Sequence, residues 1–90
     1  DVGRLCTIFL EDTDGRLERL TDAIRTNDFK RVRDEAHAVK GSVANFDARQ
    51  AMQASSALES ERDSARLGER YARFAHEIHF LQHIVRNYAG

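Results

Sequence analysis

The sequence lacks proline and tryptophan, and it has only one cysteine. A single thiol excludes an internal disulfide, and Cys6 is interpreted as a buried, reduced thiol rather than a catalytic one. The net charge is −1, from 14 basic and 15 acidic residues, which gives no electrostatic case for binding nucleic acid or a membrane surface. No apolar run approaches the roughly 20 residues that span a bilayer.

The apolar residues that are present recur at steps of three and four, and alternating strand patterns are absent. This periodicity is typical of amphipathic helices, so the chain is predicted to be all-α. Ninety residues make one small domain, so we expect a single unit over residues 1–90. Because the chain opens at Asp1 directly on an apolar pattern, we expect it to be excised from a longer protein, a sensor kinase.

Five helical segments are expected, and caps mark several of their starts. Asp28, Asp47 and Ser64 are predicted to cap the third, fourth and last helices, and Thr13 or Asp14 the second. The segments cover about residues 2–11, 14–25, 29–46, 48–60 and 65–88.

The last segment carries a seam of apolar residues, from Leu67 to Tyr88, that alternate by four and three, as in a bundle of nearly parallel helices. Short connections make sequential helices antiparallel neighbours. We therefore predict an up-down four-helix bundle with a short additional N-terminal helix. Phe80 and Ile84 fall off the seam, and the first helix or a neighbouring domain is expected to cover them.

His37 lies on the polar side of the third predicted helix. At about 100° per residue, it points roughly 130° away from the core stripe, so the imidazole is expected to face water. Gly41 and Ala44 follow one and two turns later on nearly the same face, and neither can shield the ring. Glycine inside a helix costs about 1 kcal/mol relative to alanine. We interpret Gly41 as leaving room for a partner protein.

Basic residues surround this histidine along the helix. Lys30 and Arg33 precede it, and Lys40 follows three residues on, within reach on the helix surface. Cations favour the neutral ring, which has an unprotonated nitrogen that can act as a nucleophile. Lys40 could then hold a phosphoryl group carried on that nitrogen.

The segment from Ala36 to Ser42, AHAVKGS, resembles the motif of histidine phosphotransfer domains. The likeness extends over about residues 5–88: Phe9-Leu10-Glu11-Asp12 is similar to the family's opening, and Leu58-Glu59 to the end of the helix after the motif. Asn45-Phe46-Asp47-Ala48 stands where the family often has a leucine-glycine-alanine turn. Asp47 there replaces the usual glycine, and aspartate tolerates the left-handed conformation better than most residues.

The resemblance implies that His37 carries the phosphoryl group, Lys40 stabilises it and Gly41 keeps the surface open. Ser42 matches a family position that assists by hydrogen bonding, but it points away from His37 on this helix, so we assign it no role. Arg33, Ala44 and Ala48 are expected to contact the partner.

The partners implied are receiver domains of response regulators. The ring of His37 would take the phosphoryl group from a receiver's aspartyl phosphate, and a second receiver's aspartate would take it back. No cofactor is expected on this domain, because Mg²⁺ and most of the catalytic machinery belong to the receiver. The domain would be a phosphoryl carrier without kinase activity of its own, located in the cytoplasm. It would be the tail of a membrane-bound hybrid sensor kinase, an independent shuttle, or the leading domain of a chemotaxis-type kinase.

A second function class rests on His76, His79 and His83, which share the polar face of the last helix. His79 and His83 have the i, i+4 spacing that can chelate a metal. This alternative is a helical interaction or metal-binding bundle in which His37 is incidental. No cysteine accompanies the three histidines, and the nearest carboxylate, Glu77, lies off their stripe.

Overall fold

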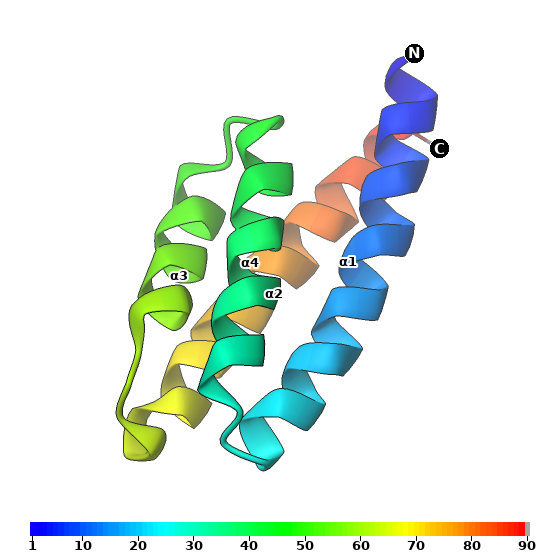
Figure 1. The fold of residues 1–90 in the computed structure, drawn as a ribbon. Helices are drawn as coiled ribbons and strands as arrows, with labels where there is room; N and C mark the ends of the chain where they lie inside the picture. Colours follow the sequence, from blue (N-terminus) through cyan, green and yellow to red (C-terminus); the bar gives the residue numbers. More distant parts are fainter. Residues whose placement is uncertain (90) are drawn as a thin grey trace.

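A computed structural model describes residues 1–89, and these form an antiparallel bundle (Figure 1). The helices are α1 (Val2–Arg25), α2 (Phe29–Ala44), α3 (Arg49–Ser60) and α4 (Ser64–Ala89). Within these residues each helix packs against two others, in the ring α1–α2–α3–α4. The all-α prediction and the up-down order of the bundle are confirmed.

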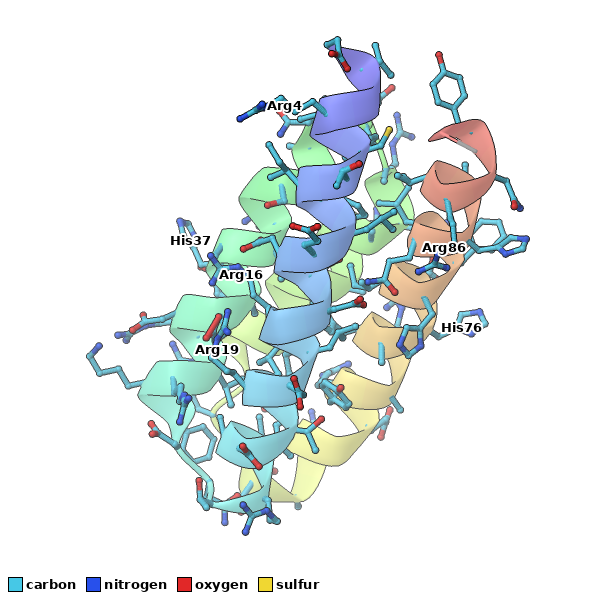
Figure 2. The ribbon with its side chains drawn as sticks, turned by 90° about the vertical axis from the view of Figure 1, so that its right-hand side faces the viewer. Arg4, Arg16, Arg19, His37, His76 and Arg86 are labelled. Atoms are coloured by element: carbon cyan, nitrogen blue, oxygen red, sulfur yellow. The ribbon has the colours of Figure 1, made fainter. Side chains whose placement is uncertain are left out.

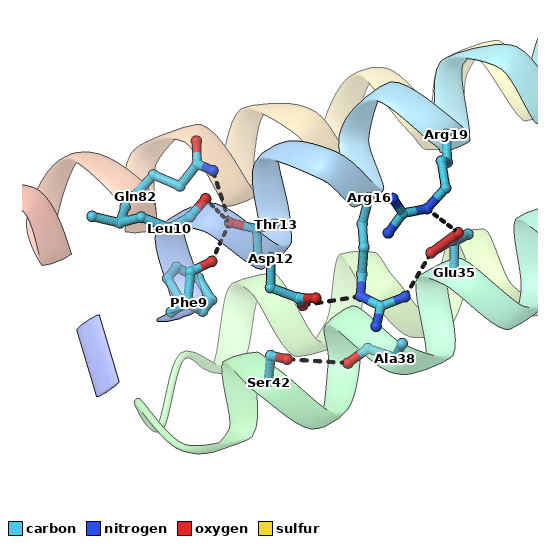
Figure 3. Close-up of polar contacts among 10 residues, drawn as sticks. All are labelled: Phe9, Leu10, Asp12, Thr13, Arg16, Arg19, Glu35, Ala38, Ser42 and Gln82. Carbon is cyan, nitrogen blue, oxygen red and sulfur yellow. Dashed lines mark hydrogen bonds and ion pairs between the residues drawn. The ribbon is translucent and has the colours of Figure 1, made fainter. Parts of the chain in front are cut away.

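The predicted short N-terminal helix is wrong as a separate element, because α1 runs unbroken through residues 11–14. Thr13 is buried, and its hydroxyl donates backwards to the carbonyl of Phe9 at 2.7 Å instead of capping a new helix. Gln82 of α4 donates from Nε2 to Thr13 Oγ1 at 2.8 Å and to Asp14 Oδ1 at 2.9 Å. The polar groups that looked like a cap therefore join α1 to α4 (Figure 3).

The core follows the predicted helical stripes. On α2 the buried apolar residues are Val32, Ala36, Val39 and Val43, and on α4 they are Leu67, Phe74, Ile78, Leu81 and Val85. Tyr88, predicted on the seam of α4, is instead exposed at the end of the bundle where α1 begins and α4 ends (Figure 1). Phe80 and Ile84 are exposed too, so α1 does not cover them.

The connections follow from local chemistry. Asp28 caps α2, because its side chain accepts a hydrogen bond from the backbone N–H of Arg31 at 3.1 Å. Asp47 adopts the left-handed conformation expected of it, with φ 52°, but it does not cap α3. The cap residue there is Ala48, which has no side chain to accept a hydrogen bond. The backbone N–H of Ala65 donates to Asp63 Oδ1, so Asp63 takes the role predicted for Ser64.

A buried carboxylate fixes α2 against α1. Glu35 is 8% exposed and accepts hydrogen bonds from Arg16 Nη1 and Arg19 Nε, both at 2.7 Å (Figure 3). Burial acts to raise the pKa of Glu35, but the bonds from Arg19 and Arg16 outweigh it and the pKa is lowered. Because Glu35 lies two residues before His37, these ion pairs also hold the rotation of α2 that turns His37 outward.

Replacing Glu35 by glutamine should lower the free energy of unfolding at pH 7 by about 1–3 kcal/mol, because two arginines lose their carboxylate. Because the pKa of Glu35 is lower in the folded state, its ionised form stabilises the fold at pH values above the unfolded-state pKa of about 4.3. This contribution is lost as the pH falls through the folded-state pKa. The difference in the free energy of unfolding between wild type and Glu35→Gln should therefore become smaller below about pH 4. Urea unfolding at pH 7 and pH 3 measures this, with the exposed Glu18→Gln as control. A constant difference at both pH values would contradict the ion-pair explanation.

Candidate functional site

His37 projects from the middle of α2 into solvent. Its side chain is 72% exposed and points away from the bundle in Figure 2. Ala36 and Val39 of the same helix face the core and are buried. The outward orientation expected from periodicity is confirmed. The imidazole is therefore accessible to another protein.

The surface beyond His37 is open toward the end of α2. A Cβ atom built on Gly41 would meet no atom within 4 Å outside its own stretch of helix, and Ala44 is exposed. Gly41 has no positive φ, so its backbone does not demand glycine. The absence of a side chain at Gly41 thus serves the openness of the surface rather than the geometry of the helix.

The structure adds one residue to the site that the sequence did not single out for chemistry. Glu59, near the end of α3, places Oε1 2.7 Å from Nδ1 of His37. A carboxylate can only accept, so Nδ1 carries the proton and donates to Glu59. The other ring nitrogen, Nε2, then keeps its lone pair. Glu59 thus selects the tautomer in which Nε2 has the free lone pair.

Lys40 shares this carboxylate with His37. Its Nζ lies 3.7 Å from Glu59 Oε2, and its side chain is 38% exposed. Lys40 therefore lies beside the histidine, as its spacing predicted. The surroundings are not purely cationic, however, because the carboxylate of Glu59 lies against the ring, which the sequence did not predict.

A second group of charges lies one turn earlier on α2. Lys30 Nζ donates to Asp34 Oδ2 at 2.8 Å, and Arg33 Nε is 3.5 Å from Asp34 Oδ1. The hydrogen bond from Lys30 is the main reason that the pKa of Asp34 is lowered. All three side chains are about half exposed or more. Arg33 is therefore accessible on the surface, and its contact with a partner stays a prediction.

The other predicted contact residues lie as follows. Ser42 donates its hydroxyl to the carbonyl of Ala38 at 3.3 Å, which agrees with its lack of a role at His37. Ala48 is half-buried and lines a groove with Phe80 and Ile84 of α4. The structure does not bring Ala48 to His37, and its contact with a partner stays a prediction.

The three histidines of α4 are not grouped as metal ligands in the residues that the structure describes. His76, His79 and His83 are exposed, and Nε2 of His83 lies 3.0 Å from the amide of Asn87. In the described part of the chain, no three histidine, cysteine or acidic side chains are grouped so that they could hold a metal ion. The alternative of a metal-binding bundle therefore gains no support. His76 marks the opposite side of the molecule from His37 in Figure 2.

Fold and site together define a four-helix bundle in which an exposed histidine of α2 lies beside a carboxylate and a lysine. A comparison with protein families places residues 4–84 in the Hpt domain. The chain therefore belongs to the Hpt domain family, whose members are phosphotransfer intermediates of two-component phosphorelays and interact with receiver domains. No curated protein and no solved structure gives a significant match. None of the helices in residues 1–89 combines the length and hydropathy that crossing a membrane requires.

Proposed function

We propose that His37 is the phosphoryl carrier, which accepts the group on Nε2 from a receiver's aspartyl phosphate and gives it to a second receiver's aspartate. The observation that carries this proposal is the exposed ring whose Nδ1 is bound to Glu59 at 2.7 Å. That contact leaves Nε2 as the atom that can attack. The alternative tautomer would leave the carboxylate of Glu59 facing an unprotonated nitrogen.

The transfer needs no general base, because no proton has to be removed from the ring. Nε2 uses its lone pair to form the N–P bond while the P–O bond to the receiver's aspartate breaks, and the aspartate leaves as a carboxylate. Nδ1 keeps its proton, so the phosphorylated ring becomes a cation. Glu59, which already accepts that proton, stabilises the positive ring. The reverse step returns the ring to its neutral form, and no proton has to enter or leave the site.

Lys40 would stabilise the charge of the phosphoryl group. Its Nζ is held only at 3.7 Å by Glu59, so it can turn toward new oxygen acceptors at little cost. Mg²⁺ would come with the receiver and not with this domain. The domain would then act as a carrier without kinase activity of its own, in the cytoplasm with its receivers, as a shuttle or as part of a sensor kinase.

The docking surface would follow α2 from Arg33 through Gly41 to Ala44. Ile8 of α1 is exposed and lines a shallow groove with Ser42 and Asn45, which extends this surface with an apolar contact. Ala48 would lie at its edge. Such a surface combines a basic side chain, which suits the acidic site of a receiver, with small and apolar groups that allow close approach.

The direct test is transfer of label. The domain is incubated with receiver domains that carry ³²P-labelled aspartyl phosphate, and the label that reaches the domain is followed over time. Label that is stable in alkali and lost in acid would be on a histidine, and mass spectrometry of peptides should place it on His37. Absence of label with every receiver from the same cell would sink the proposal.

Glu59→Gln should slow transfer by about tenfold, because a neutral amide stabilises the cationic ring less than a carboxylate does. The measurement is the single-turnover rate from a phosphorylated receiver, with Glu69→Gln on the exposed side of α4 as the matched control. In addition, ¹⁵N spectra of His37 should show the Nδ1–H tautomer in the wild type and a mixture in Glu59→Ala. Equal rates and unchanged tautomers would remove Glu59 from the mechanism.

A further inference from the structure

Two basic side chains near His37 each make a long contact with a carboxylate, and that carboxylate makes a shorter contact with another residue. Arg33 Nε is 3.5 Å from Asp34 Oδ1, whereas Lys30 bonds the other oxygen of Asp34 at 2.8 Å. In the same way Lys40 is 3.7 Å from Glu59 Oε2, whereas His37 bonds Oε1 at 2.7 Å. Arg33 can therefore leave its carboxylate without leaving that carboxylate unpaired.

Arg33 is also placed next to the histidine ring. It precedes His37 by four residues, so the two side chains are neighbours on one helix face. Helical side chains lean toward the N-terminus, and the ring of His37 therefore lies over the turn that holds Arg33 and Asp34. On the helix circumference, Arg33 lies about 40° to one side of His37 and Asp34 about 60° to the other. The Arg33–Asp34 pair thus crosses the face from which the ring projects.

From these positions we infer that Arg33 moves from Asp34 to the phosphoryl group of phosphorylated His37 and becomes its second cation beside Lys40. This rests on the proposed function. A phosphoryl group carries nearly two negative charges, more than one carboxylate, and its oxygens match the fork of a guanidinium. Lys30 stays on Asp34, so that carboxylate remains neutralised when Arg33 leaves.

Asp34 has the opposite effect in this arrangement. It competes with the phosphoryl group for Arg33, and its own charge repels the added anion from the same face of α2. Before phosphorylation the group contains three cations, Lys30, Arg33 and Lys40, and two carboxylates, Asp34 and Glu59. Removing Arg33 should disfavour the phosphorylated form, whereas neutralising Asp34 should favour it.

The test is the equilibrium constant for exchange of the phosphoryl group between the domain and one fixed receiver. This constant compares the free, separated proteins, so it does not respond to contacts that Arg33 makes with the docked receiver. Arg33→Gln should shift it toward the phosphorylated receiver by about threefold to tenfold, and Asp34→Asn should shift it the other way by about twofold to fivefold. Arg31→Gln is the matched control, because Arg31 is exposed on the same helix but lies about 120° from His37.

A measurement on the wild type avoids mutation altogether. The domain is phosphorylated with phosphoramidate, without any receiver, and the Nε–Hε signal of Arg33 is followed by NMR. It should shift on phosphorylation while that of Arg31 stays in place. Unchanged Arg33 signals, or equal shifts of the equilibrium in Arg33→Gln and Arg31→Gln, would overturn the inference while leaving His37 as the carrier. If every receiver fails to label wild-type His37, the proposed function is overturned, and this inference with it.

Discussion

His37→Gln is expected to reduce labelling of the domain by a phosphorylated receiver to background. Glutamine has a similar size, but its amide nitrogen has no available lone pair, so the N–P bond cannot form. The exposed position predicts that the free energy of unfolding changes by no more than about 0.5 kcal/mol. Labelling and urea unfolding of the same preparation would show a complete loss of phosphoryl transfer without loss of stability.

The control for this variant is the triple change of His76, His79 and His83 to glutamine. All three side chains are exposed on α4, and His76 lies on the other side of the bundle from His37 in Figure 2, so the change should not affect labelling. The same triple variant addresses the metal-binding alternative, since zinc binding measured by titration should be equally weak before and after the change. Labelling that survives in His37→Gln, or disappears in the triple variant, would move the carrier site to α4.

Gly41→Leu is expected to increase the stability of the domain and to slow phosphoryl transfer. The new side chain begins in open space, so the helix should gain about 0.5–1 kcal/mol from the better propensity of leucine. The melting temperature should rise by roughly 4–8 °C per kcal/mol gained. Transfer from a receiver should fall by about 10- to 100-fold, because the side chain keeps the receiver's phosphate from its attack distance.

Two comparisons make the result of Gly41→Leu specific. Phosphoramidate is small enough to reach His37 past leucine, so labelling by this donor should keep its wild-type rate. Gly68→Leu on α4 is the matched substitution, since Gly68 is also exposed and has no atom near its Cβ position. It should stabilise the domain and leave transfer unchanged. A Gly41→Leu domain that receives phosphoryl groups at the normal rate would contradict the role assigned to this glycine.

Helical periodicity in the sequence was sufficient to predict most of the bundle. The apolar stripes of α2 and α4 repeat over several turns, so their helices and the outward direction of His37 follow from the spacing alone. Asp28 is in a turn between two such stripes, which made its cap predictable as well. These features depend on residues that are close together in the chain.

The features that were missed depend on contacts between helices. Thr13 and Asp14 look like a helix start in sequence, but their side chains bond Gln82, which lies 69 and 68 residues away. Glu59 meets His37 only because α3 folds back along α2, and the chemistry of the pair depends on how both helices are rotated. Counting back from the turn at residues 45–48 would have placed Glu59 within about a turn of His37, and this was the available signal.

Nε2 of His37, the proposed carrier atom, lies on one face of α2, and this would determine the order in which the partners act. A single imidazole nitrogen cannot be shared, and a receiver seated on α2 covers the approach for any other. The donor and the acceptor would therefore bind in succession, and the phosphorylated domain would have to be stable between the two binding events. With His37 as the carrier, the domain would hold one phosphoryl group at a time, so receivers would compete for it and the rate of transfer to each would depend on their relative abundance.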